Sequence, residues 1–195
     1  MSTDRAGPDA GDADAFDRLR RRVLWAMPTG LFVVGSRSGD RRNLMTCNWA
    51  MQVATTPKLV AVGVESGSVT RRLVEEGGSF SVSLLARSER GLVRRFVKPV
   101  RDVEVDDAGV ARALQGVPVV EVVGGLPVLD AAVAWLACSV RSIQEWAVDG
   151  APAAGSHVLV VGEVVDVGES PRLANPGDGD GAVLSMEDTR MNYGG

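Results

Sequence analysis

Residues 43–71 read NLMTCNWAMQVATTPKLVAVGVESGSVTR. Apolar and polar side chains alternate through the first half of this stretch, which is typical of a half-buried strand. Thr56-Pro57 interrupts the alternation, and KLVAVGVE (58–65) resumes it. The stretch therefore predicts two neighbouring strands, 43–54 and 58–65, followed at Gly67 by a turn from which a helix can begin.

Strand patterns also lie on both sides of this stretch. LFVVGS (31–36) precedes it, and a turn at Ser38-Gly39-Asp40 pairs that segment with 43–54 as a hairpin. Short helices are expected at about 69–76 and 89–97. Many strands without strand–helix–strand alternation favour an antiparallel barrel or sandwich over a doubly wound sheet. The remaining predicted strands are SFSVSLL (79–85), VAWLACSVRSIQEW (133–146), HVLVVGEVVDV (157–167) and, as a last edge strand, VLSM (183–186).

The chain has 195 residues, which is long enough for one domain with a substantial core. Residues 1–13 are small and acidic and predict a disordered leader, so that 14–195 forms a single domain. A first helix is expected to begin at an N-cap, Asp14, and to end near Pro28. Its apolar residues recur at helical spacing: Phe16, Leu19, Val23 and Leu24.

Composition excludes several classes of protein. No apolar run approaches the ~20 residues that span a bilayer, and no apolar signal segment is present, so we expect a cytoplasmic protein without membrane contact. Cys47, Cys138 and the single His157 are too few for a disulfide framework or a structural zinc site, and no G-x-S-x-G motif occurs. Acidic ends and a mildly basic body suit a small anionic ligand better than nucleic acid. Any chemistry is then expected to come from an organic cofactor.

The sequence GSVTR (67–71) has the features of a phosphate site. Ser68 follows a strand and precedes a helical pattern, so it is a natural N-cap. The first amides of the helix, the Thr70 hydroxyl and the Arg71 guanidinium could then bind an anion together. An ordinary capped surface helix would show the same sequence.

The sequence TCNWA (46–50) suits a flat aromatic ligand. It places polar groups and an indole next to one another, and an isoalloxazine ring needs an apolar wall together with donors for its N5 and carbonyl oxygens. The alternative is a strand whose Trp49 packs in the core or at a dimer contact.

Taken in order along the chain, these segments resemble the flavin reductase-like family of FMN-binding split barrels. The resemblance covers residues 30–167 and rests on five blocks in the right order and spacing. The blocks are LFVVGSRSGDRRNLMTCNWAMQVATTPKLVAVGV, SVTRRLVEEGGSFSVSLL, the segment around Leu92 to Phe96, LPVLDAAVAWLACSV and SHVLVVGEVVDV.

The resemblance implies a mainly β, antiparallel Greek-key split β-barrel with a few short helices. It also implies a homodimer with the flavin near the subunit interface. The strand at 46–50 would lie along the isoalloxazine and the turn at 68–71 would hold the phosphate, while His157 would position the nicotinamide nucleotide. The implied cofactor-binding residues are Thr46, Cys47, Asn48, Trp49, Ala50, Val64, Glu65, Ser68, Thr70, Arg71 and Phe96.

The activity implied is that of an NAD(P)H:flavin oxidoreductase, with FMN as the flavin, FAD as the alternative, and a monooxygenase as a recipient of reduced flavin. Three features depart from the family pattern: the pair Asn48-Trp49, the long approach to His157 (EWAVDGAPAAGS), and the C-terminal SMEDTRMNYGG. These departures keep two other hypotheses open. One is an electron-transfer flavoprotein that holds FMN for a protein partner, and the other is a non-catalytic barrel for another planar cofactor.

Overall fold

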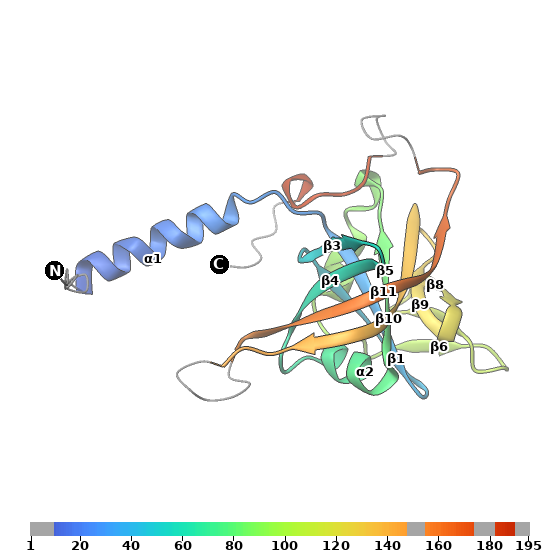
Figure 1. Cartoon of the computed structure of the whole chain (residues 1–195). Coiled ribbons are helices and arrows are strands. Elements are labelled where there is room, and N and C mark those ends of the chain that lie inside the picture. The colour runs from blue at the N-terminus through green and yellow to red at the C-terminus, as the bar shows by residue number, and fades with distance from the viewer. Residues whose placement is uncertain (1–9, 148–154, 174–181, 190–195) are drawn as a thin grey trace.

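The computed structural model describes residues 10–147, 155–173 and 182–189. Two antiparallel sheets account for most of this part of the chain, and a long N-terminal helix stands away from them (Figure 1). The prediction of a mainly β, antiparallel fold is confirmed. The shape is consistent with the split barrel that the resemblance implied.

The larger sheet has seven strands in the order β2-β1-β5-β10-β11-β4-β3. Every neighbouring pair is antiparallel. The hairpins β1-β2 and β3-β4 form its two edges, and the hairpin β10-β11 lies near its centre. Strand β5 lies between β1 and β10. The strands are β1 (Phe32–Ser38), β2 (Arg41–Cys47), β3 (Ala50–Thr55), β4 (Lys58–Glu65), β5 (Ser79–Leu84), β10 (Ala134–Gln144) and β11 (His157–Glu169).

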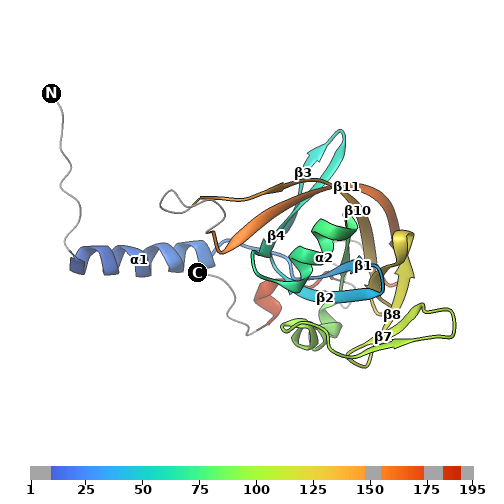
Figure 2. The ribbon, with the colours of Figure 1, turned by 90° about the horizontal axis from the view of Figure 1, so that it is seen from below.

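Helix α2 (Val69–Gly77) packs against four strands of this sheet, β1, β2, β4 and β5. Seen from below, the sheet curls and α2 lies within its curve (Figure 2). The helix buries Thr70, Leu73 and Val74 and ends at Gly78, whose φ of 64° is the left-handed conformation that glycine adopts without strain. The predicted helix at 69–76 is confirmed.

A smaller four-stranded sheet covers one end of the curled sheet and was not predicted. Its strands are short and are separated by glycine turns, so their local pattern is weak. The buried Arg42 on β2 ties the two sheets together, because it pairs with Glu121 and donates to the carbonyl of Gly109 at 2.8 Å. The strands are β6 (Val103–Val105), β7 (Ala111–Leu114), β8 (Val117–Val122) and β9 (Leu126–Leu129), with a 3-10 turn, η3 (Val123–Gly125).

The core divides into two clusters of buried apolar side chains. One lies inside the curl of the large sheet, around Phe80, Val62 and Val160. The other lies between the two sheets, around Leu44, Phe96 and Leu129.

Four predicted elements differ from the structure. Helix α1 spans Ala10–Trp25, so it begins inside the predicted leader and Asp14 lies within it rather than capping it; residues 1–9 lie outside the described residues. The expected helix at 89–97 is two 3-10 turns, η1 (Arg87–Glu89) and η2 (Leu92–Phe96).

The expected edge strand at 183–186 is also absent. Val183 and Ser185 make only single bridges, to Ala86 and Gly30, before the 3-10 turn η5 (Met186–Asp188). The carboxylate of Asp188 accepts from the backbone N–H of Ser185 at 2.9 Å, which favours a helical turn there over an extended strand.

The most informative difference concerns the segment 43–54, which the alternating pattern predicts as one strand. The structure divides it into β2 and β3, which lie on opposite edges of the large sheet. Only Asn48 and Trp49 connect them. A sheet can join its two edges through two residues only by curling until those edges meet.

Contacts across the two-residue corner Asn48-Trp49 show that the edges do meet. The β3–β4 ladder continues up to the corner, where the backbone N–H of Gly63 on β4 donates to the carbonyl oxygen of Trp49 at 2.8 Å. The thiol of Cys47, the last residue of β2, lies 3.7 Å from the carbonyl oxygen of Gly63.

Candidate functional site

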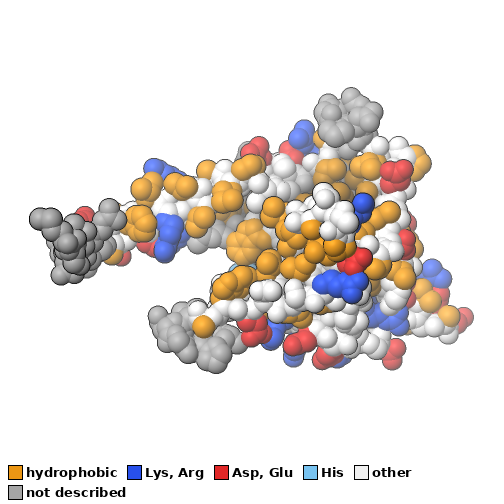
Figure 3. All heavy atoms as spheres, in the orientation of Figure 1, with side chains coloured by type: hydrophobic (Ala, Val, Ile, Leu, Met, Phe, Trp, Pro, Cys, Tyr) orange, Lys and Arg blue, Asp and Glu red, His pale blue; other side chains and the backbone are white. Residues whose placement is uncertain are grey.

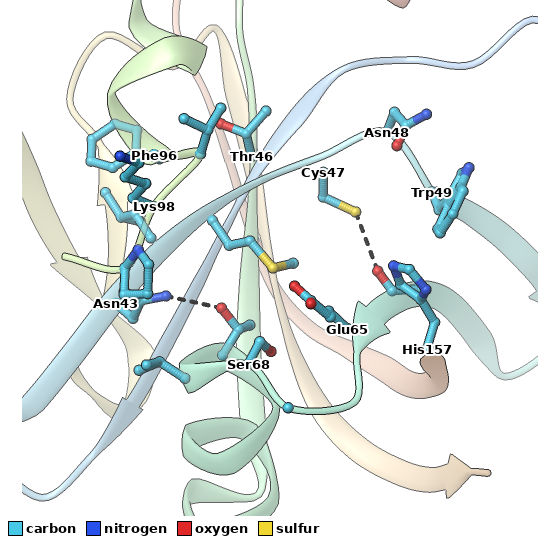
Figure 4. Close-up of a pocket in the computed structure, with 18 residues that line it drawn as sticks. Asn43, Thr46, Cys47, Asn48, Trp49, Glu65, Ser68, Phe96, Lys98 and His157 are labelled. Atoms are coloured by element: carbon cyan, nitrogen blue, oxygen red, sulfur yellow. Dashed lines mark hydrogen bonds between the residues drawn. The ribbon is translucent and has the colours of Figure 1, made fainter. Parts of the chain in front are cut away.

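An open cavity of about 280 Å³ lies at the Asn48-Trp49 corner (Figure 4). Its floor is the end of β2, and its walls come from the end of β4, the start of α2, the segment after η2 and the first residue of β11. The size is near the lower end of the range for pockets that hold organic cofactors. The lining residues are 43–49, Gly63, Glu65, 67–70, 96–99 and His157.

The structure brings nine of the predicted site residues to this cavity. They come from four separate segments of the chain, which the fold places around one opening. They are Thr46, Cys47, Asn48, Trp49, Glu65, Ser68, Thr70, Phe96 and His157.

Three predicted site residues do not line the cavity. Ala50 is the first residue of β3 and lies just past the corner. The Val64 side chain is 1% exposed and belongs to the core inside the sheet, because successive residues of a strand point to opposite faces. The Arg71 guanidinium is paired with Glu145 and lies 3.7 Å from Glu75, and Arg71 is not among the residues that line the cavity.

One end of the cavity is the first turn of α2. The predicted N-cap is confirmed: Ser68 is extended, with φ −74° and ψ 159°, and its hydroxyl oxygen accepts from the Arg71 N–H at 3.0 Å. Within the described residues, the N–H groups of Val69 and Thr70 have no partner. Free first-turn amides and the helix dipole both favour an anion at this position.

The opposite end of the cavity is aromatic. Trp49 and His157 meet edge to face, with ring centroids 4.6 Å apart and planes at 70°. Trp49 also packs on the backbone at Gly63, where an added Cβ would lie 3.1 Å from the indole. The indole is 39% exposed, so it presents an apolar surface at the mouth of the cavity.

The imidazole of His157 faces Glu65 across the β4–β11 ladder, where the two residues are directly paired. Partial burial lowers the pKa of His157 below its ordinary value, and the charge of Glu65 opposes this by raising it. His157 is therefore neutral above pH 7. In that state it offers an aromatic face and hydrogen bonds rather than a positive charge.

Cys47 lies on the floor of the cavity, but its thiol is chemically quiet. Burial raises its pKa to about 12, with a smaller opposing effect from the backbone N–H of Trp49. A thiol with such a pKa stays protonated at neutral pH, so it is a poor nucleophile. Its contribution is the shape of the floor.

Of the cavity residues that the sequence analysis did not predict, two have polar side chains, Asn43 and Lys98. Asn43, 2% exposed, lies beside the start of α2, and Lys98 follows Phe96 on the facing segment. Lys98 lines the cavity and makes no ion pair with any described residue, so its charge is free to act on a ligand. The charge of Arg71, by contrast, is paired with Glu145. The only local signal for Lys98 was its place directly after a predicted helix; Asn43 fits an ordinary strand pattern and gave none.

Comparison with known proteins places this geometry in a family. A family model described as the flavin reductase like domain matches residues 24–187. The chain belongs to this family. The resemblance drawn from residues 30–167 is thereby confirmed.

Individual members and solved structures align with this chain over most of their length. A flavin reductase (NADH) from Kitasatospora aureofaciens is 30% identical over 175 residues, which cover 87% of this chain and 78% of that protein. The structure of the Streptomyces globisporus C-1027 NADH:FAD oxidoreductase SgcE6 in complex with NAD and FAD fragments is 28% identical, with a TM-score of 0.61 over 82% of this chain and 86% of its own. The styrene monooxygenase flavin reductase of Pseudomonas putida S12 is 25% identical, with a TM-score of 0.59 over 78% and 87%.

Within the described ranges, no group of three or more His, Cys, Asp or Glu side chains could hold a metal ion. In the same part of the chain, no helix combines the length and the apolar character needed to cross a membrane.

The titration of His157 tests the electrostatics of the cavity. The chain has one histidine, so imidazole NMR signals of the untagged protein belong to His157 without further assignment. We expect a titration midpoint below the ordinary value of about 6.5 in the folded protein. Glu65→Gln should lower the midpoint further, because it removes the charge that favours the imidazolium. A midpoint above the ordinary value, or a rise in Glu65→Gln, would contradict this description.

Proposed function

We propose that this chain is an NAD(P)H:flavin oxidoreductase that binds one flavin along the Asn48-Trp49 corner. The observation that carries the proposal is a single cavity with an anion site at one end and an aromatic pair at the other. A flavin mononucleotide has the same polarity, with a phosphate at one end and a planar ring at the other. The names of the relatives support the same chemistry.

The residues present fit such a ligand. The free N–H groups of Val69 and Thr70 and the Thr70 hydroxyl would bind the phosphate, with Lys98 supplying the positive charge. The floor from Thr46 to Asn48 would lie along the ring and offer backbone and amide groups to its polar edge. Arg71, which the sequence suggested as the phosphate's cation, is not part of this proposal because its charge is paired with Glu145.

The hydride transfer itself is chemistry that the bound flavin supplies, by accepting hydride at N5 from nicotinamide C4. The protein's part is to hold two rings at reacting distance and to exclude water between them. Trp49 and the neutral His157 form the apolar rim where the nicotinamide would lie. Because hydride passes directly from one ring to the other, no general acid or base is assigned.

The finer identities follow from the relatives and remain proposals. NADH is the nucleotide named for the Kitasatospora aureofaciens reductase, and we propose it for this chain. FMN is proposed as the preferred flavin because the anion site is a single first turn, with FAD as the alternative. A monooxygenase as the recipient of reduced flavin is supported by the styrene monooxygenase reductase. The cytoplasmic location expected from the sequence would give access to the nucleotide.

Turnover separates this proposal from its rivals. Purified protein is mixed with NADH or NADPH, and nucleotide oxidation is followed with and without added FMN or FAD. We expect oxidation that accelerates when flavin is added. His157→Asn should raise the KM for the nucleotide while leaving the dissociation constant of FMN near the wild-type value, because His157 lies at the far end from the phosphate.

No oxidation of either nucleotide by the FMN-loaded protein would overturn the proposal. Slow reduction by nucleotide together with fast reduction by a redox protein would instead favour the electron-transfer flavoprotein. A purified protein whose spectrum shows another chromophore and which binds no flavin would favour the non-catalytic barrel.

We further propose that the chain forms a homodimer through α1 and the exposed face beside it. Apolar side chains run along α1 and continue onto the neighbouring face of the barrel (Figure 3). A helix with such a stripe is unfavourable in water unless something covers it. The exposed large apolar residues on and after α1 are Phe16, Leu19, Val23, Leu24, Trp25 and Met27, and those on the edge strand β3 are Met51 and Val53.

Sedimentation tests the dimer. We expect the full chain to sediment as a dimer, and the double variant Leu19→Glu/Val23→Glu to dissociate because it places charges in the apolar stripe. Arg18→Glu and Arg22→Glu, singly, are the matched controls, since they change charge on the same helix without entering the stripe. A monomeric wild-type protein, or a double variant that remains fully dimeric, would contradict the proposal.

A further inference from the structure

The buried Asn43 side chain connects the two walls of the cavity's anion end. Its amide nitrogen lies 2.9 Å from the hydroxyl oxygen of Thr70, in the first turn of α2. Its amide oxygen lies 2.8 Å from the backbone nitrogen of Val100, just after the segment that carries Lys98. In Figure 4, Asn43 lies between Lys98 and Ser68.

The Val100 contact fixes the orientation of the Asn43 amide. A backbone N–H can only donate, so the group that faces it must be the Asn43 oxygen rather than the NH₂. The NH₂ group is therefore turned toward Thr70. Because an amide NH₂ can only donate, the Thr70 hydroxyl oxygen must accept this hydrogen bond.

The same constraint fixes the direction of the Thr70 proton. A hydroxyl whose oxygen accepts from Asn43 keeps its own O–H free to donate elsewhere. Thr70 is 1% exposed and lines the cavity, and no acceptor for its proton is found among the described residues. The free O–H is therefore a third unpaired donor on the first turn of α2, in addition to the N–H groups of Val69 and Thr70.

Asn43 also holds the second wall. The hydrogen bond from Val100 fixes the end of the 97–100 segment against β2, and Lys98 belongs to that segment. Both contacts of the amide are satisfied and buried, so each supports the geometry of the other. Loss of the Asn43 side chain would release both the Thr70 hydroxyl on one wall and the segment that carries Lys98 on the other.

We propose that Asn43 is a positioning residue for the flavin phosphate, which it serves by turning the Thr70 hydroxyl proton into the cavity and anchoring the segment of Lys98. The inference rests on the proposed function, because it concerns the phosphate end of the same flavin site. Asn43 itself need not touch the ligand. It acts by making the Thr70 hydroxyl oxygen a hydrogen-bond acceptor, which leaves the O–H free to donate to the ligand.

The test compares the affinities of FMN and riboflavin, which differ only in the phosphate. Asn43→Ala should weaken the binding of FMN about fivefold to tenfold, which corresponds to the loss of one hydrogen bond. It should leave the binding of riboflavin unchanged. Asn43→Asp keeps the shape and the contact with Val100. Its carboxylate accepts the Thr70 proton and adds a negative charge, so it should weaken FMN by more than tenfold, again without affecting riboflavin.

Two further variants separate positioning from loss of structure. The Thr70→Val variant lacks the hydroxyl. In that background, Asn43→Ala should reduce the affinity for FMN by a clearly smaller factor than it does in the wild-type protein. Ser83→Ala is the matched control: Ser83 is a buried hydroxyl that accepts from the Leu129 N–H at 3.1 Å, away from the cavity. It should leave the preference for FMN over riboflavin intact.

The outcomes distinguish this inference from the function on which it rests. Equal affinities of the wild-type protein for FMN and riboflavin would remove the phosphate site and the inference with it. A wild-type preference for FMN that survives in Asn43→Ala and Asn43→Asp would overturn the inference and leave the proposed function standing. Equal losses for FMN and riboflavin would show that Asn43 only maintains the fold.

Discussion

Strand β2 ends on one edge of the seven-stranded sheet and β3 begins on the other, with only Asn48 and Trp49 between them. In a flat sheet those edges would be about 29 Å apart, at about 4.8 Å for each strand spacing. Three peptide links reach at most about 11 Å. The sheet must therefore curl until its edges meet, and this connection determines where they do so. The remaining features of the site follow from that place.

The candidate site lies where the sheet closes because the corner residues cannot join a regular ladder on both sides. Their backbone and side chains remain available to a ligand, and Trp49 covers the gap beside Gly63. The chain then runs back through β3 and β4 and reaches the same place at Glu65, where it turns into α2. One continuous segment, residues 43–70, thereby supplies both the floor of the cavity and its anion end. Phe96, Lys98 and His157 complete the walls from elsewhere in the chain.

How much the sequence could predict depends on how local each feature is. The Ser68 cap was predicted because a cap is specified by a few neighbouring residues. The strands at 58–65 and 157–167 were recognised from their own apolar pattern. The corner at Asn48-Trp49 was missed because alternation continues across it, and only the partners of each half show that the two halves lie on opposite edges.

Side-chain direction was the least predictable part. Arg71 occupies a position from which it could reach an anion at the helix start, yet its guanidinium is paired with Glu145, 74 residues further along the chain. Lys98 and Asn43 reach the cavity only because tertiary packing brings η2 and β2 beside α2. His157 was placed near the cavity by resemblance alone, since one histidine at the start of a strand has no local signature.

A crystal structure of the protein with FMN tests the central claim, that one flavin lies along the corner with its phosphate on α2. The account predicts electron density for the isoalloxazine along Thr46 to Asn48. It predicts the phosphate within hydrogen-bonding distance of the Val69 and Thr70 N–H groups and the Thr70 hydroxyl. A phosphate bound at another place, or a ring that lies away from the Asn48-Trp49 corner, would contradict it.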